Sequence, residues 1–286
     1  MINPFCVPGC CRHALGFHLK PRLALPRMEK TDRPLILVTN DDGIFAPGIK
    51  TLAEEMKAFG EVLVVAPDKP QSAMGHAITI HNFLRLREVE FMEGVRAFSC
   101  TGTPVDCVKL AVYHIIKGRP ALLVSGINHG SNLSINVLYS GTMSAAVEGA
   151  LEGIPSVGFS LMDHSIEASF EHTRPVVRSV TANVLANGLG KGCCLNVNIP
   201  ANSEGPIKGI RVCRQAIGHW EDAVDTRKDP AGHEYHWLKG KFTANDHGED
   251  TDVWATGHGY ASLVPVQFDM TAHHEVGNIN MWDHAL

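Results

Sequence analysis

The chain has 286 residues, of which 44% are hydrophobic and 19% are charged, and its formal net charge is −5. Such a composition can bury a large core in one α/β unit with appendages. No basic region is present to hold a nucleic-acid polymer, and no apolar run approaches the roughly 20 residues that cross a membrane. We therefore exclude a nucleic-acid polymer and a membrane as partners. A small anionic substrate is compatible with the net charge if a bound metal supplies positive charge at the site.

Residues 1–30 lack hydrophobic periodicity and the apolar segment of a secretory signal, so we predict a disordered leader, with Met28 as an alternative start. The alternative interpretation is a metal site in this leader, but the ligand spacing fits no standard zinc pattern. Its ligands would be Cys6, Cys10, Cys11 and His13. The eight cysteines of the chain form no C-x-x-C pair, which is typical of free thiols in a reducing compartment.

From residue 35 onward, short apolar runs alternate with segments of helical periodicity. Such alternation predicts a mostly parallel sheet with right-handed crossovers, that is, an α/β core over residues 31–200. The predicted strands are 35–39, 62–66, 121–125, 156–160 and 195–199, with an extended pair of strands at 77–87. The predicted helices are 47–59, a helix that begins at Pro104, 142–151 and 175–186.

Residues 201–286 differ from this core, because they are rich in His, Gly and Asp, with extended pieces at 207–213 and 260–266. They also contain every tryptophan of the chain, and tryptophan is enriched where subunits meet. We predict a β-rich extension that acts as an oligomerisation arm. The alternative is an intramolecular hairpin that covers a sheet edge. The tryptophans are Trp220, Trp237, Trp254 and Trp282.

The run Asn40-Asp41-Asp42-Gly43 directly follows the first predicted strand. Adjacent carboxylates at the end of a buried strand are costly unless a cation neutralises them, and hard divalent cations prefer carboxylate oxygens. A plain turn needs only one or two such residues, and a haloacid-type phosphatase needs D-x-D instead of D-D. The pattern predicts Asp41 and Asp42 as metal ligands.

Polar residues follow two further predicted strands. Ser72 lies in the loop after 62–66, where a neutral oxygen can complete a magnesium-type site, although a serine there can also be an ordinary loop residue or a cap. Asn128 and Asn132 lie in the glycine-containing segment after 121–125. Because parallel sheets bind ligands beyond the carboxyl ends of their strands, we expect these side chains on one edge of the sheet.

The run Tyr139-Ser-Gly-Thr142 opens the next predicted helix. Free N–H groups at a helix start bind anions, and the two hydroxyl groups add donors, so we predict phosphate binding by Ser140, Gly141 and Thr142. The alternative is plain N-capping, which needs a single hydroxyl. The sequence has no P-loop, dinucleotide fingerprint or G-x-S-x-G elbow.

In combination, four motifs resemble the SurE family of survival-protein nucleotidases over about residues 33–270. They are Leu37-Val-Thr-Asn-Asp-Asp-Gly-Ile, Ala66-Pro-Asp with Ser72-Ala-x-Gly-His-x-Ile-Thr, Ser125-Gly-Ile-Asn-x-Gly-x-Asn, and Tyr139-Ser-Gly-Thr. The resemblance implies a Rossmann-like core with helices on both faces of the sheet and a cytoplasmic location. It also implies a homodimer or tetramer built through the C-terminal arm.

The resemblance further implies a divalent-metal-dependent phosphatase that hydrolyses nucleoside 5′- and 3′-monophosphates, with one Mg²⁺ or Mn²⁺ per subunit. Asp41 and Asp42 would be catalytic, and Asn40 and Asn132 would join the substrate contacts. Either water or Asp41 could be the nucleophile. The alternatives are a broad acid phosphatase or exopolyphosphatase, and a non-catalytic metal-binding dimer. The metal ligands carried over from the family are Asp41, Asp42, Ser72 and Asn128.

This chain departs from the family pattern after Asn132 and Leu133. The family has a glycine and an acid in this segment, where the chain has Ser134 and Asn136. The shape of this loop and the preferred nucleotide therefore stay open at the level of sequence.

Overall fold

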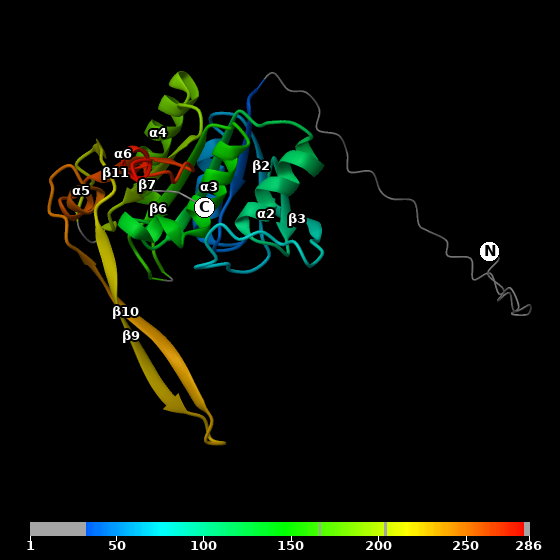
Figure 1. Cartoon of the computed structure of the whole chain (residues 1–286). Coiled ribbons are helices and arrows are strands. Elements are labelled where there is room, and N and C mark those ends of the chain that lie inside the picture. Colours follow the sequence, from blue (N-terminus) through cyan, green and yellow to red (C-terminus); the bar gives the residue numbers. More distant parts are fainter. Residues whose placement is uncertain (1–32, 166, 203–204, 283–286) are drawn as a thin grey trace, which may run out of the picture.

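The computed structural model describes residues 33–165, 167–202 and 205–282; the leader predicted for residues 1–30 lies outside these ranges. A nine-stranded sheet forms the centre, in the order β3-β4-β2-β1-β5-β6-β7-β11-β8 (Figure 1). Its strands are β1 (Leu35–Thr39), β2 (Glu61–Pro67), β3 (Leu86–Met92), β4 (Val95–Cys100), β5 (Leu122–His129), β6 (Ser156–Leu161), β7 (Cys193–Ile199), β8 (Ile210–Val212) and β11 (Ala261–Gln267).

The six inner strands from β4 to β7 pair in parallel, whereas β3 and β11 pair antiparallel with their inner neighbours. The inner strands are apolar on both faces because both faces are covered by helices. Along β1, Ile36 and Val38 face one layer and Leu37 faces the other. The predicted mostly parallel α/β fold is therefore confirmed.

The helices form two layers around this sheet. Apolar residues of α1 and α4 pack on one face, and those of α2 and α3 pack on the other. None of the helices in the described ranges is long and apolar enough to cross a membrane. The helical elements beside the sheet are α1 (Pro47–Met56), α2 (Pro104–Leu110), which continues as the π-helix η1 (Ala111–Ile116), the 3₁₀ turns η2 (Ser134–Leu138) and η3 (Glu171–Thr173), α3 (Gly141–Leu151) and α4 (Arg174–Asn187).

The strand pair predicted at residues 77–87 is wrong in position, because the pair is formed by β3 and β4 and residues 77–85 are an irregular loop. Hydrogen bonds to side chains, instead of a strand ladder, fix the path of this loop. Asp106 accepts hydrogen bonds from the backbone N–H (3.0 Å) and the hydroxyl (2.6 Å) of Thr79. The apolar alternation that suggested a strand is solvent-exposed, since Ile80 is 71% exposed.

The chain after residue 200 has two parts. The strands β8 and β11, with α5 (Asp252–Gly257), extend the central sheet. Between them, β9 (Gly218–Lys228) and β10 (Glu234–Ala244) form a separate two-stranded antiparallel hairpin that projects far from the body of the molecule (Figure 1). After β11 comes α6 (His273–Ile279), which has no buried residue.

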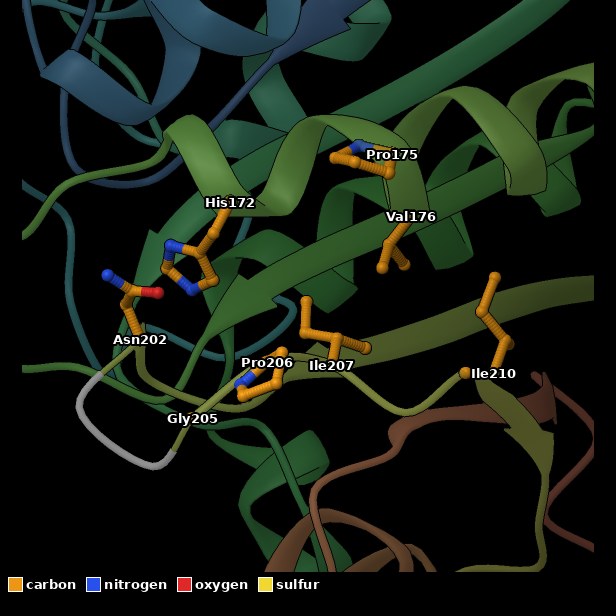
Figure 2. Close-up of a pocket in the computed structure, with 9 residues that line it drawn as sticks. His172, Pro175, Val176, Asn202, Gly205, Pro206, Ile207 and Ile210 are labelled. Carbon is orange, nitrogen blue, oxygen red and sulfur yellow. The ribbon is translucent and has the colours of Figure 1, made fainter.

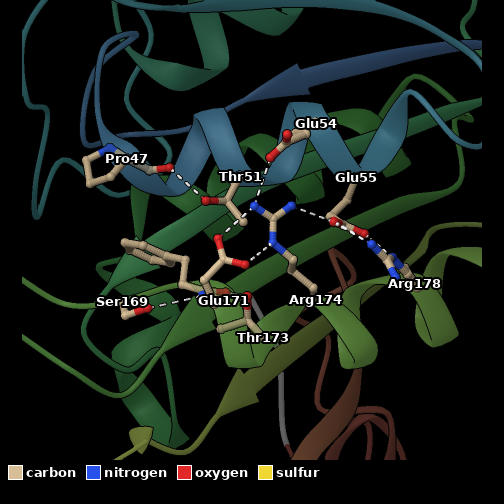
Figure 3. A network of polar contacts seen from close by, with 10 residues as sticks. Pro47, Thr51, Glu54, Glu55, Ser169, Glu171, Thr173, Arg174 and Arg178 are labelled. Carbon is tan, nitrogen blue, oxygen red and sulfur yellow. Dashed lines mark hydrogen bonds and ion pairs between the residues drawn. The ribbon is translucent and has the colours of Figure 1, made fainter.

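A polar network joins α1 to α4 on the outside of one helix layer (Figure 3). The carboxylate of Glu55 is buried and accepts hydrogen bonds from Arg174 (2.6 Å) and from Arg178 (3.0 Å). Arg174 also pairs with Glu171 of η3 at 2.8 Å. Burial raises the pKa of Glu55, but the two arginines outweigh burial and hold it below its ordinary value of 4.5. The network therefore fixes the position of η3, next to which Phe170 lies.

We expect Glu55→Gln to lower the free energy of unfolding at pH 7 by about 2 kcal/mol, because charge-assisted hydrogen bonds to a buried carboxylate are lost. The depressed pKa means that this contribution is present above the ordinary glutamate pKa and is lost as pH falls through the folded-state value. Urea unfolding at pH 7 and pH 3 measures it. A difference between the two proteins that persists undiminished at pH 3 would contradict the assignment.

Candidate active site at the carboxyl edge of the sheet

The chain passes from β1 to β2 on one side and later places β5 on the other side of β1. The crossover helices α1 and α2 lie on opposite faces, so the carboxyl ends of β1 and β5 form a topological switch point, where α/β sheets bind ligands. The backbones of α1 and β5 approach each other closely at this point. A Cβ on Gly48, near the start of α1, would lie 2.0 Å from the carbonyl oxygen of Ile127.

Asp41 is buried at this switch point, with 5% of its surface exposed, and the start of α3 packs on it. The Thr142 hydroxyl donates a hydrogen bond to Asp41 Oδ1. Gly141 permits this contact, because a Cβ there would lie 2.7 Å from the Asp41 Cβ. The structure thus brings together the predicted acid and the predicted phosphate-binding turn, which are about a hundred residues apart in sequence.

Burial and the neighbouring charge of Asp42 raise the pKa of Asp41 from 3.8 to about 6, against hydrogen bonds from Thr142 that lower it. A carboxylate in this position is under-neutralised by the protein itself. A cation bound between the two acids would remove the penalty, so the electrostatics of the site fit a metal ion.

Asp42 is held by His129, the last residue of β5. The backbone N–H of His129 donates to Asp42 Oδ2 at 3.1 Å, and the ring nitrogen Nδ1 lies 3.4 Å from the same oxygen. The His129 ring packs edge-on against Phe170 at 4.8 Å between centroids. The sequence interpretation did not include His129. Its position directly after Asn128, at the end of a strand, could have indicated it.

Asn40 supplies a further oxygen at this edge. Its Nδ2 donates to the carbonyl of Gly43 at 2.9 Å, while its buried Oδ1 has no hydrogen-bond partner. Two more buried hydroxyl oxygens without a partner, of Thr39 and Ser125, lie on residues paired across β1 and β5. Since buried polar atoms are nearly always paired in native proteins, this group fits a polar or cationic ligand.

Ser72 lies in an exposed turn of the loop after β2. The preceding residue ties this turn to the acids, because the Gln71 N–H donates to the backbone oxygen of Asp41 at 2.8 Å. Farther along the loop, His76 pairs with the buried carboxylate of Glu148 on α3 at 2.9 Å. The loop is therefore anchored on both sides of Ser72.

The two predicted asparagines of the β5 segment differ in environment. Asn128 is half-buried, and its Nδ2 donates to the Gly130 carbonyl at 2.9 Å. Asn132 is buried, with its Nδ2 donating to Ser160 and its N–H donating to the side chain of Asn198, both at 2.7 Å. These bonds fix the turn against β6 and β7.

The donor set is small, since no group of three or more His, Cys, Asp or Glu side chains in the described part of the chain is arranged around one point. Two acids supplemented by neutral Ser and Asn oxygens are hard ligands of the kind that suits Mg²⁺ or Mn²⁺. The chemistry of the residues therefore fits such an ion.

A cavity of about 490 Å³ lies elsewhere, between the start of α4 and residues 202 and 205–210 (Figure 2). Its lining is mainly apolar, with Val176, Ile207 and Ile210 facing inward, and none of the predicted site residues contributes to it. No acidic side chain lines this cavity, and it is separate from the candidate site.

Residues 36–222 match the family model described as "Survival protein SurE". The chain belongs to the SurE family. A curated 5′-nucleotidase SurE of Christiangramia forsetii is 59% identical over 87% of this chain and 97% of its own length. The corresponding protein of Cytophaga hutchinsonii is 57% identical over 87% and 96%.

Among solved structures, the SurE protein from Aquifex aeolicus matches with a TM-score of 0.74 and 38% identity, covering 86% of this chain and 98% of that one. The family resemblance noted from the four motifs is confirmed. Among the motif residues of this SurE-family chain, Asp41 contacts Thr142 at the switch point, with Asp42 held beside it by His129.

We expect Asp41→Asn to stabilise the metal-free protein. The raised pKa of Asp41 means that the folded state loses stability as pH rises from 3.8 through about 6. The substitution removes this loss, so at pH 7.5 in EDTA the variant should be more stable by on the order of 2–3 kcal/mol. The difference should vanish near pH 4. Thermal unfolding at both pH values tests this, and a variant less stable than wild type at pH 7.5 would contradict it.

Proposed function

We propose that this protein is a divalent-metal-dependent nucleotidase that hydrolyses nucleoside 5′-monophosphates, and 3′-monophosphates as well, to nucleoside and phosphate. The observation that carries the proposal is the buried Asp41 beneath the start of α3, with Asp42 beside it. This arrangement joins a cation site to an anion-binding helix terminus. The curated relatives named 5′-nucleotidase support the same activity.

Four residues would hold one Mg²⁺ or Mn²⁺ per subunit. When bound, the ion would polarise a phosphoryl oxygen as a Lewis acid. His129 orients Asp42, while Thr142 orients Asp41 and so has its hydroxyl engaged. The four residues are Asp41, Asp42, Ser72 and Asn128.

The phosphate would be bound by groups at the start of α3. Ser140 is the N-cap, and its Oγ accepts from the Met143 N–H at 3.0 Å, which leaves its hydroxyl proton available to a phosphate oxygen. The Gly141 N–H belongs to the first turn of the helix, where backbone donors have no intrahelical partner. The unpaired Oδ1 of Asn40 would accept a hydrogen bond from a protonated phosphate or a bound water.

A substrate panel tests this proposal. We expect phosphate release from AMP at a rate at least tenfold above that from tripolyphosphate, abolished by EDTA and restored by Mn²⁺. Asp42→Asn should reduce kcat/KM by at least a hundredfold, because a carboxylate ligand is lost. Preferred release from tripolyphosphate would favour an exopolyphosphatase. If the protein binds metal but hydrolyses no phosphate ester, the result would indicate a non-catalytic metal-binding protein.

We further propose that the hairpin β9–β10 mediates homo-oligomerisation. Its side chains are exposed along most of its length, including Val224 (60%), Trp237 (58%) and Leu238 (85%), and it extends away from the sheet (Figure 1). A lone two-stranded ribbon has little core of its own and gains by pairing with a second subunit. A cytoplasmic location is supported by the free thiols of all five cysteines in the described ranges.

The hairpin can be shortened without touching the sheet, because Glu221 pairs with Lys241 in the ladder. Replacing residues 222–240 by an Asn-Gly turn should leave a folded protein whose mass in light scattering falls to that of the monomer. Deletion of everything after residue 244 would not serve, since β11 lies in the central sheet. If the shortened protein has the same oligomeric mass as wild type, the hairpin does not mediate oligomerisation.

A further inference from the structure

Residues 133–139, here called the entry segment, connect β5 to the start of α3. The segment contains the 3₁₀ turn η2 and ends directly before the N-cap Ser140, so its backbone decides where the phosphate-binding turn begins. The Tyr139 carbonyl also accepts a hydrogen bond from Gly75, in the loop that carries Ser72, at 3.2 Å. The conformation of this segment is thus part of the geometry of the site.

A buried carboxylate attaches the entry segment to the base of the hairpin. Asp252, at the start of α5, is fully buried. Its Oδ2 accepts from the Ser134 N–H at 2.8 Å, and its Oδ1 accepts from the Ala216 N–H at 2.9 Å. The Ser134 hydroxyl then donates to the Ala216 carbonyl at 2.8 Å. Two segments about eighty residues apart are joined by three hydrogen bonds around one acid.

Ser134 needs these bonds, because its φ of 52° lies in the left-handed region that disfavours residues other than glycine. In this chain, the bonds to Asp252 and Ala216 oppose the backbone strain. The shape of the entry segment therefore depends on its partners rather than on local freedom.

The first residues of the hairpin make a second attachment. The indole Nε1–H of Trp220 donates to Asn136 Oδ1 at 2.9 Å, and the Trp220 ring packs edge-on against Phe242 at 6.0 Å. Gly218 permits the close approach, because a Cβ there would lie 3.0 Å from the Ser134 hydroxyl oxygen and 2.7 Å from the Phe242 ring. Residues 216–220, here called the hairpin root, therefore contact the entry segment directly.

We propose that the hairpin root positions the entry segment for nucleotide binding, with Trp220 and Asn136 as the positioning pair. The inference rests on the proposed nucleotidase function. The metal ligands on the β1 and β5 ends have their own anchors, such as the His129 N–H to Asp42. Loss of the Trp220–Asn136 bond should therefore weaken substrate binding and leave metal affinity unchanged.

A double-mutant cycle tests the pair in the full-length protein. Trp220→Phe keeps the ring and removes the donor, and Asn136→Ala removes the acceptor. Each should raise the KM for AMP about three- to tenfold, as expected for one lost hydrogen bond, with kcat and Mn²⁺ affinity within about twofold of wild type. The double variant should be no worse than either single one. Asn136→Asp keeps an acceptor and should retain the wild-type KM.

Trp237→Phe is the matched control, because this tryptophan lies farther out on the same hairpin, opposite Asp225. It should leave KM unchanged, with light scattering reporting the oligomeric mass of every variant. Hydrogen exchange gives a readout independent of catalysis: amides of residues 133–139 should exchange faster in Trp220→Phe and not in Trp237→Phe.

The outcomes separate the two proposals. If the wild-type protein hydrolyses no nucleotide, the proposed nucleotidase function is wrong. The hydrogen-exchange rates then still decide whether the hairpin root holds the entry segment in place. An active enzyme in which Trp220→Phe and Asn136→Ala change neither KM nor exchange, or in which their effects on KM simply add, overturns the positioning pair alone.

Discussion

The buried carboxylate of Asp41 is the constraint around which the catalytic edge is organised. Placing an acid beside Asp42 at the end of a strand surrounded by apolar residues costs free energy, and the fold offsets only part of that cost with the Thr142 hydroxyl. Gly141 is required so that α3 can start directly on the acid. The site is thus built with residual negative charge, which a divalent ion can balance.

The parallel core was predictable from sequence because a strand buried on both faces must be apolar throughout, as in β1 and β2. The candidate site was proposed from sequence for a related reason, since paired acids directly after such a strand are costly to bury unless a cation lies beside them. The sequence could not indicate that β11 joins the central sheet, because an alternating strand does not specify its neighbour. It also missed the loop at residues 77–85, whose path is set by a distant acid, Asp106.

Polar side chains inside the sheet edge explain how the β5 segment keeps its shape. Asn196 donates to the Asn132 carbonyl at 2.8 Å, and Asn198 donates to Asn196 at 3.0 Å, so the network with Ser160 is connected across β6 and β7. Buried networks of this kind stabilise one arrangement when their members are satisfied. Buried oxygens without a hydrogen-bond partner occur on or next to β1 and β5, at Thr39, Asn40 and Ser125, where a ligand is expected; Ser262 on β11 carries another.

The base of the hairpin is connected to the segment that leads into α3. The hairpin that projects from the body begins two residues after Ala216, which shares Asp252 with Ser134. The start of the hairpin is therefore joined by hydrogen bonds of 2.8 to 2.9 Å to a backbone position with a φ of 52°. Because Ser134 lacks the freedom of glycine, the segment has few alternative conformations to absorb a displacement. The path of the segment that leads into the start of α3 therefore depends on this hydrogen-bond network as well as on its own residues.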